Sequence, residues 1–311
     1  MKYISTKEMS REEWIDKRHE SIGASEAGCF FGLNPWKTLV ELYYEKIGET
    51  EGIPDNMNMR LGREIEPIIK KLFEEDTGLK VVNDNKIRVD PIHPFITTNL
   101  DGMVVGEKVP IEYKMMGIWD GEIPDYYFAQ IQHQMMVTQS PYCYFVVLKV
   151  AQPRLLSIQK YNRDEQFITD LREREIKFWN ENVLKGIPPE PEEVRDMKLL
   201  NPKSDDGSST DLEDKDPVFD SIKDYIDMRN EIKGLKKKMD TLKLNVMSWM
   251  GDNESAMYLD RKVISWKSTK DYLEFDETGF SKDFPDIYKK YTRNKAGHRR
   301  FLIKEIIYEK K

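Results

Sequence analysis

The stretch from Gly186 to Asp216, rich in Pro, Ser, Gly and acidic residues, most constrains how this chain can fold. It carries ten Asp or Glu residues against four Lys or Arg, and such a composition cannot supply a hydrophobic core. The sequence therefore predicts a first domain over residues 1–185, an acidic linker over 186–216 and a helical extension over 217–311. With 311 residues in all, the first domain is long enough to bury a substantial core.

Upstream of the linker, the order of sequence patterns predicts an α/β domain. Helical periodicity occurs in "SEAGCFFG", in "LVELYYEKIG", in a longer segment that stops at Gly78, and at 126–138 and 163–183. Apolar or alternating runs predict strands at 86–89, 103–105, 109–115, 142–150 and 155–161. Helices and strands in this order predict a central mixed sheet flanked by helices.

Downstream of the linker, eight apolar residues recur at alternating spacings of three and four, as in a coiled coil. They are Tyr225, Met228, Ile232, Leu235, Met239, Leu242, Val246 and Trp249. Two interpretations stay open: a helical arm that packs within its own chain, or a surface for subunit assembly. A short hairpin pattern follows at 255–268.

The composition excludes several classes of protein. Cys29 and Cys143 are the only cysteines, so neither a disulfide framework nor a four-cysteine metal site is expected. The first 20 residues lack the apolar core of a signal peptide, and no apolar run spans a bilayer, so we expect a cytoplasmic protein with no membrane partner. The net charge of −7 argues against a protein that coats nucleic acid, although a carboxylate cluster would itself make a nuclease acidic.

Three charged residues stand in unusual places in the strand region. Asp101 ends one apolar segment, and Glu112 and Lys114 lie two apart in the next, so the latter two project from the same face of a strand. Two carboxylates and a backbone carbonyl can hold Mg²⁺, while a lysine can orient the attacking water. A tight turn through "VVGEK" would bring Asp101 near Glu112, and Glu66 on the upstream helix offers a third acid.

Each candidate also has an ordinary structural interpretation. An Asp, a Glu and a Lys at this spacing arise by chance in a chain with 34% charged residues. Glu66 is alternatively a solvated acid above a buried stripe of Ile65, Ile68, Ile69 and Leu72. Ser25 is alternatively a helix N-cap with Glu26 in the first turn.

Other polar and aromatic residues are expected to serve the fold. Gln132 and Gln134 are interpreted as surface or inter-helix residues, and the four histidines match no ligand spacing. Trp36, Trp119 and Tyr126 could stack on DNA, but packing is the simpler interpretation.

Five blocks together resemble, in order and spacing, the lambda-exonuclease/YqaJ family of viral recombination nucleases over about residues 11–185. They are "WIDKRHESIGASEAGCFFGLNPWKTLVELYYEKIG", "LGREIEPIIKKLFEEDTG", "TTNLDG", "IEYK" and "YYFAQIQHQMMVT". The resemblance implies a PD-(D/E)xK nuclease core, here followed by a C-terminal helical arm and a small hairpin extension. It also implies a Mg²⁺-dependent 5′ to 3′ double-strand DNA exonuclease, with Mn²⁺ as a substitute ion, which leaves 3′ single strands for phage-type recombination by annealing.

The resemblance also assigns roles to individual residues. Glu66, Asp101 and Glu112 match the metal-binding acids, and the carbonyl of Tyr113 matches the backbone ligand. Lys114 matches the catalytic lysine, and Gln130 the active-site glutamine, with Tyr127 one turn before it. Arg18 and Ser25 match the residues that receive the terminal 5′-phosphate, a role that suits a guanidinium and a helix N-terminus.

The implied partners are double-stranded DNA ends, a single-strand annealing protein of the RecT/Red-beta type, and further copies of the chain in a ring-shaped trimer. Two other functions stay open. One is a structure- or site-specific DNA endonuclease on the same core. The other is a non-catalytic DNA-binding or assembly module whose carboxylates are structural.

Overall fold

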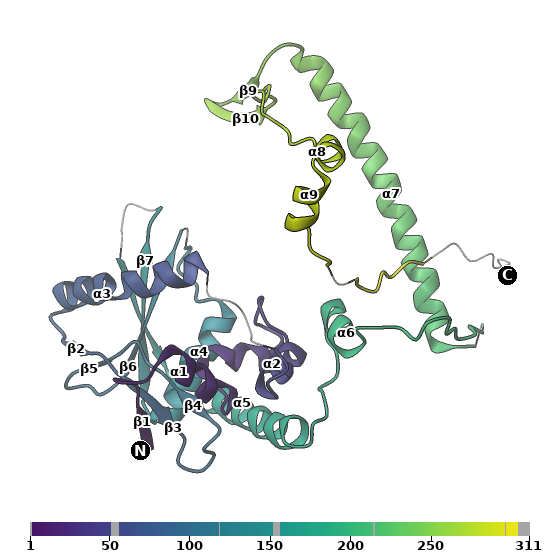
Figure 1. The fold of residues 1–311 in the computed structure, drawn as a ribbon. Coiled ribbons are helices and arrows are strands. Elements are labelled where there is room, and N and C mark those ends of the chain that lie inside the picture. Colours follow the sequence, from purple (N-terminus) through teal and green to yellow (C-terminus); the bar gives the residue numbers. More distant parts are fainter. Residues whose placement is uncertain are drawn as a thin grey trace. The chain divides into compact units, whose positions relative to one another are not determined.

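The chain divides into two units, Met1–Pro202 and Lys203–Lys311 (Figure 1). The computed structural model describes residues 2–50, 56–117, 119–151, 156–213, 215–295 and 297–303. The first unit includes helix α6 (Val194–Leu200), which lies in the range expected to be a linker. The Thr38 hydroxyl donates to the buried Asp196 carboxylate at 2.5 Å, which fastens α6 to the first unit.

A five-stranded mixed sheet forms the centre of the first unit, as the sequence predicts. Its order is β2 (Val81–Val82), β5 (Gly102–Val104), β6 (Pro110–Met116), β7 (Tyr142–Lys149) and β8 (Leu156–Asn162). Strands β6 and β7 are parallel and the other pairs antiparallel. Helix α4 (Asp125–Thr138) makes the crossover that a parallel pair requires. Leu155, the expected start of β8, lies outside the described residues.

Helices cover both faces of this sheet. Helix α3 (Met57–Thr77) covers one face, where the buried residues include Ile69, Phe73, Val146 and Leu148. Helix α4 covers the other, where they include Ile131, Met135, Cys143, Phe145 and Val147. Successive residues of β7 therefore enter two different cores, which explains its nearly continuous apolar run.

The expected buried stripe of α3 is only partly correct. Ile69 is buried and Ile65 and Leu72 are partly buried, but Ile68 is 52% exposed. Phe73 lies four residues beyond Ile69 and fills the core in place of Ile68. The helix ends where predicted, because Gly78 adopts the left-handed conformation with φ of 72°.

The remaining elements of the first unit surround the central sheet. A second antiparallel sheet has the order β1 (Lys2–Ser5), β3 (Lys86–Val89) and β4 (Thr97–Thr98). The helices are α1 (Arg11–His19), the 3₁₀ helix η1 (Ala24–Phe31), α2 (Leu39–Lys46), and α5 (Glu165–Lys177) with its π-helical continuation η2 (Phe178–Val183). Because Gly23 is the N-cap of η1, Ser25 lies inside the helix and is not the alternative N-cap.

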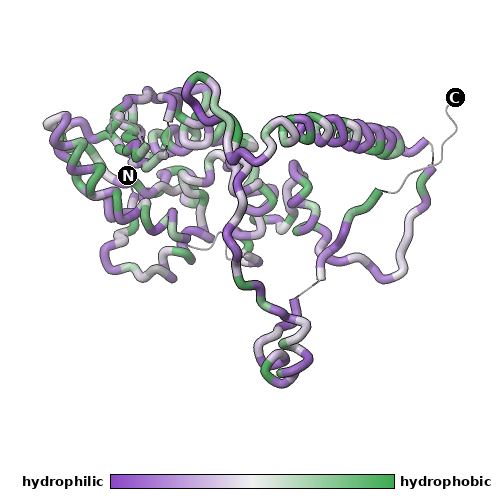
Figure 2. Tube along the Cα trace, turned by 90° about the horizontal axis from the view of Figure 1, so that it is seen from above, coloured by the Kyte–Doolittle hydropathy of each residue, from purple (hydrophilic) through white to green (hydrophobic). Residues whose placement is uncertain are grey.

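The second unit is dominated by α7 (Pro217–Met250), a helix of 34 residues. It begins with proline at its first position, where the missing N–H costs no hydrogen bond. The expected hairpin follows as β9 (Ser255–Tyr258) and β10 (Arg261–Ser265), and then come α8 (Glu277–Asp283) and α9 (Pro285–Tyr291). Figure 2 shows hydrophobic residues recurring between hydrophilic ones along α7.

Among the helices in the described part of the chain, none combines the length and apolar character needed to cross a membrane.

Candidate active site

Glu112 is the centre of a polar cluster between β6 and α4. Its carboxylate is 2% exposed. One oxygen, Oε1, accepts hydrogen bonds from the Lys114 ammonium and from Nε2 of Gln130 at 2.6 Å. The other, Oε2, accepts from Nε2 of Gln134 at 2.6 Å. Three donors therefore hold one buried carboxylate in a single orientation.

Asp101 lies beside Glu112 because β5 and β6 form the predicted antiparallel pair. Gly102 is opposite Ile111 in this pair, and Asp101 Oδ2 accepts the backbone N–H of Tyr113 at 2.8 Å. Burial raises the pKa of Asp101 well above its ordinary value, and the nearby Glu112 carboxylate raises it further. The two acids are thus close enough to repel each other.

Glu66 extends this acidic region from α3. Its side chain is half-buried. Burial raises its pKa, and the charge of Glu112 raises it further, while Lys114 and Arg63 oppose the shift. This coupling argues against a fully solvated acid on the helix face, which was the alternative interpretation.

Lys114 is the cation that these acids share. Burial alone would lower its pKa, but Glu112 and Asp101 raise it above the ordinary value. Its Nζ lies 4.7 Å from the centre of the Tyr127 ring, which fixes the ammonium between the ring and the acids. Tyr127, Gln130 and Gln134 follow one another along one side of α4, so a single helix supplies the ring and both amides.

The sequence interpretation missed the role of one amide. Gln134 was expected to be a surface or inter-helix residue, but it is 1% exposed and bonds Glu112. Its position four residues after Gln130 was the available signal, because such residues share a helix face. Gln132, also expected to be a surface or inter-helix residue, is buried; its side chain donates to the Asn162 carbonyl and accepts the N–H of Asp164, the N-cap of α5.

The acids come together only in part. Within the described ranges, no three His, Cys, Asp or Glu side chains converge closely enough to hold one metal ion. The cluster instead offers adjacent carboxylates of Asp101 and Glu112, with the Tyr113 N–H bonded to Asp101 and with Glu66 close enough to interact electrostatically with both acids. Such a set suits an ion that needs few protein ligands.

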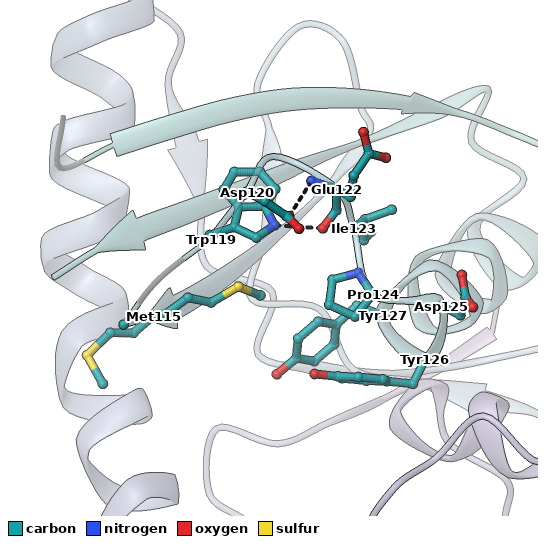
Figure 3. A pocket seen from close by; sticks show the side chains of 11 residues that line it. Met115, Trp119, Asp120, Glu122, Ile123, Pro124, Asp125, Tyr126 and Tyr127 are labelled. Atoms are coloured by element: carbon teal, nitrogen blue, oxygen red, sulfur yellow. Dashed lines mark hydrogen bonds between the residues drawn. The ribbon is translucent and has the colours of Figure 1, made fainter. Parts of the chain in front are cut away.

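A pocket of about 700 Å³ opens where β6 ends and α4 begins (Figure 3). Its walls include the rings of Trp119, Tyr126 and Tyr127 and the acidic side chains of Asp120 and Glu122. Trp119 is 7% exposed and belongs to the core, as expected, and its Nε1 donates to the Glu122 carbonyl at 2.7 Å. Tyr127 lines this pocket and also contacts Lys114, so the pocket and the polar cluster share one side chain.

Arg18 and Ser25 form a second polar group around a buried acid. Nη2 of Arg18 donates to Ser25 Oγ at 3.3 Å and to Glu26 Oε1 at 3.0 Å. Glu26 is 2% exposed and is also paired with the buried Lys46 ammonium at 2.9 Å. Burial alone would raise the pKa of Glu26, but Lys46 and Arg18 hold it below its ordinary value.

This second group is not bonded to the first. Among the described residues, no hydrogen bond or ion pair joins Arg18 or Ser25 to the acids around Glu112. The link is through packing, because η1 lies against α4: a Cβ at Gly28 would lie 3.2 Å from the Cβ of Tyr126. Sequence inspection missed Glu26 and Lys46, which lie 20 residues apart.

The other candidates have ordinary roles. His133 is fully buried, with Nδ1 2.7 Å from Glu175 and Nε2 2.8 Å from the Thr97 carbonyl oxygen. Trp36 is 54% exposed and packs edge-on against Tyr126.

Comparison with protein families and curated relatives gives a consistent picture. Residues 13–141 match the model of the YqaJ-like viral recombinase domain. The chain is 31% identical over 314 residues to an uncharacterized protein YqaJ of Bacillus subtilis (strain 168), with 96% of each chain covered. It is 25% identical over 189 residues to the uncharacterized protein R354 of Acanthamoeba polyphaga mimivirus. The aligned region covers 55% of this chain and 33% of that protein.

Solved structures with similarity to the chain include two exonucleases. One is an alkaline exonuclease, LHK-Exo, from Laribacter hongkongensis, with 24% identity, a TM-score of 0.49, and coverage of 57% of this chain and 94% of that chain. The other is a phage related exonuclease from Haemophilus somnus 129PT, with 16% identity, a TM-score of 0.44, and coverage of 56% and 99%.

Proposed function

The chain belongs to the YqaJ-like viral recombinase family, and from this premise we propose that it is a Mg²⁺-dependent deoxyribonuclease that digests double-stranded DNA from its ends. The proposed polarity is 5′ to 3′, which leaves 3′ single strands for phage-type recombination by annealing. The observation that carries the proposal is Lys114 bonded to the buried Glu112 on one face of β6, with Asp101 held alongside.

The proposed ligands of the ion are the carboxylates of Asp101 and Glu112 and the carbonyl of Tyr113, with Glu66 nearby. Hard oxygen ligands suit Mg²⁺, which commonly uses one or two carboxylates and keeps several waters. The raised pKa values of Asp101 and Glu66 support a cation here, because added positive charge would relieve the repulsion that raises them. When bound, Mg²⁺ or Mn²⁺ supplies Lewis-acid polarisation of the scissile phosphate.

The chain's own residues then orient the reactants. The Lys114 ammonium, with its side chain 20% exposed, is the group that can reach a phosphate oxygen or the attacking water. Tyr127 limits its movement from one side. The Gln130 amide donates to Glu112 and leaves its carbonyl oxygen to accept a hydrogen bond from that water.

The first experiment is digestion of a linear, end-labelled duplex in Mg²⁺ or in EDTA, compared with a closed circular duplex of the same sequence. We expect loss of the 5′ label from the linear duplex in Mg²⁺ only, and an intact circle. Cleavage of the circle would instead favour the endonuclease alternative.

Site variants test the roles of individual residues. Glu112→Ala and Lys114→Ala should each abolish digestion while duplex binding remains. Lys71→Ala and Glu75→Ala are matched controls, because they remove an exposed lysine and acid that pair on α3 at 3.8 Å, a contact of little energetic value. Cleavage at the wild-type rate by a folded Glu112→Ala or Lys114→Ala protein would refute the assignment.

We further propose that Arg18 and Ser25 receive the terminal 5′-phosphate. Glu26 holds the Arg18 guanidinium in place and leaves its other N–H groups to donate. A duplex with 5′-hydroxyl ends should be digested more slowly than one with 5′-phosphates. Arg18→Ala should remove most of that difference, and Arg18→Lys should restore little of it, because lysine lacks the planar fork. Equal wild-type rates on the two ends would show that this group serves only the fold.

The proposed partners follow from the same function. A single-strand annealing protein of the RecT/Red-beta type would bind the 3′ strand, and a ring-shaped trimer around the duplex would keep an acidic chain on its substrate. Light scattering with and without a short duplex tests the ring, and a monomer under both conditions would exclude it.

A further inference from the structure

The eight apolar residues of α7 that follow the coiled-coil spacing, here called the seam, lie on the surface of their own unit. Their side chains are 40–74% exposed, from Val246 at the low end to Trp249 at the high end. A continuous exposed stripe of this size on one helix is typical of an interaction surface rather than of scattered surface residues. The described residues of this unit therefore leave the apolar face uncovered, whereas one of the two open interpretations was an arm that packs within its own chain.

The residue types in the seam select the kind of partner. In heptad notation, Ile232 and Val246 occupy a positions, and Leu235 and Leu242 occupy d positions. β-branched residues at a, combined with leucine at d, favour two parallel helices over larger bundles. A second helix with the same sequence, aligned in register, brings the same residue types together in each layer.

Two charge pairs beside the seam are complementary for the same arrangement. In a parallel pair, each g residue faces the e residue of the following heptad on the other helix. This places Asp224 opposite Arg229, and Glu231 opposite Lys236. Each of these pairs forms twice, once from each helix to the other. Both pairs bring opposite charges together along the first half of the seam.

The alternative direction lacks these pairs. In an antiparallel pair e faces e, and the e residues Arg229, Lys236 and Lys243 would all repel. The parallel pair has one repulsive contact between a g and an e residue, Lys238 with Lys243. The charges therefore favour the parallel direction by two attractive pairs against one repulsive pair.

We propose that α7 pairs in parallel with α7 of a second copy of this chain and buries the seam in a two-stranded coiled coil. The pairing extends over the whole seam, from Tyr225 to Trp249. At the start of the seam, the ring centre of Phe301 lies 6.4 Å from that of Tyr225. Arg229 donates one N–H to the Ile303 carbonyl and has further N–H groups that can pair with Asp224 of the second copy. No residue of the candidate active site belongs to α7, so this pairing is independent of the proposed function.

Disulfide trapping in the full chain tests the arrangement. In a parallel pair a d residue meets its own copy across the axis, so Met228→Cys should give a disulfide-linked two-chain species under oxidising conditions. In an antiparallel pair the two substituted positions would lie at opposite ends. The native Cys29 and Cys143 are buried, and burial raises the pKa of Cys29 to about 12, so the unsubstituted chain is the control for background linkage.

Seam and charge variants of the Met228→Cys chain complete the test. Leu242→Glu should abolish the link and halve the mass of the wild-type assembly in sedimentation, from two chains to one or from two of the proposed rings to one. Leu244→Glu should change neither, because Leu244 is exposed to the same degree, 63% against 64%, but lies outside the seam. Glu231→Lys should weaken the link, and adding Lys236→Glu should restore it. Far-UV circular dichroism confirms that each variant keeps its helix.

Two results would overturn the pairing. One is the absence of any linked species from Met228→Cys at micromolar concentration. The other is a link that survives Leu242→Glu in a chain that has kept its helical content.

Discussion

Replacing Gln134 with leucine tests whether the buried amide acts through Glu112. Gln134 Nε2 donates to Glu112 Oε2 at 2.6 Å, and both side chains are at most 2% exposed. Leucine has nearly the same volume but cannot donate, so Oε2 would lose the one side-chain donor described for it. A hydrogen bond to a charged group contributes about 1.5–3 kcal/mol.

This magnitude predicts two measurable effects. The free energy of unfolding should fall by about 1.5–3 kcal/mol in metal-free buffer. Because Glu112 is a proposed ligand, its looser placement should also raise the Mg²⁺ concentration for half-maximal digestion, by roughly tenfold for each 1.4 kcal/mol lost from ion binding. The assays are chemical denaturation and initial rates of duplex digestion across a Mg²⁺ series.

Gln132→Leu is the matched control. Gln132 is on the same helix and is also fully buried, but its amide is bonded to the backbone of Asn162 and Asp164. It should lower the free energy of unfolding without changing the Mg²⁺ dependence. An unchanged Mg²⁺ dependence in Gln134→Leu, or an equal change in both variants, would refute the argument that Gln134 positions Glu112.

Three further variants test the packing and the buried charges of the first unit. Burial lowers the pKa of His133, but the charge and hydrogen bond of Glu175, together with the Thr97 carbonyl and the Glu26 charge, outweigh it, so the net pKa is above its ordinary value. The stabilisation that comes from protonated His133 is full below about pH 6.5 and is lost as pH rises through the raised pKa. Chemical denaturation of the wild type from about pH 6 to 9 should therefore show a free energy of unfolding that falls with pH. In Glu175→Gln this fall should be smaller. Gly102→Ala places a Cβ 2.5 Å from Val81 Cγ1, and this overpacking should lower the free energy of unfolding by about 1–3 kcal/mol. Gly62 lies in helix α3 with open space around it, so Gly62→Ala should raise the melting temperature.

Local patterns made the centre of the site predictable. Glu112 and Lys114 share a face because side chains alternate along a strand, and a short turn into an antiparallel partner places Asp101 beside them. Neither inference needs knowledge of distant parts of the chain. The central sheet was predictable for the same reason, since each of its longer strands carries its own apolar run.

Contacts between distant segments were not predictable from such patterns. Thr38 and Asp196 are 158 residues apart, and their hydrogen bond attaches α6 to the first unit despite an acidic, proline-rich composition around it. Glu26 and Lys46 look like surface charges until both are found buried as a pair. A buried charge is stable only with its partner, and sequence spacing does not identify partners across a fold.

The charge balance of the cluster supports the proposal of a divalent ion over a monovalent one. Glu66, Asp101 and Glu112 all interact with one shared cation, Lys114, and Arg63 makes a smaller contribution to Glu66. One ammonium cannot neutralise three carboxylates, and the pKa values of Asp101 and Glu66 are accordingly raised. The negative charge that Lys114 leaves uncompensated is two units when all three acids are ionised, which equals the charge of Mg²⁺ or Mn²⁺. If the proposed ion binds there, Glu112 would depend less on the ammonium, and Lys114 would be available to the attacking water and the scissile phosphate.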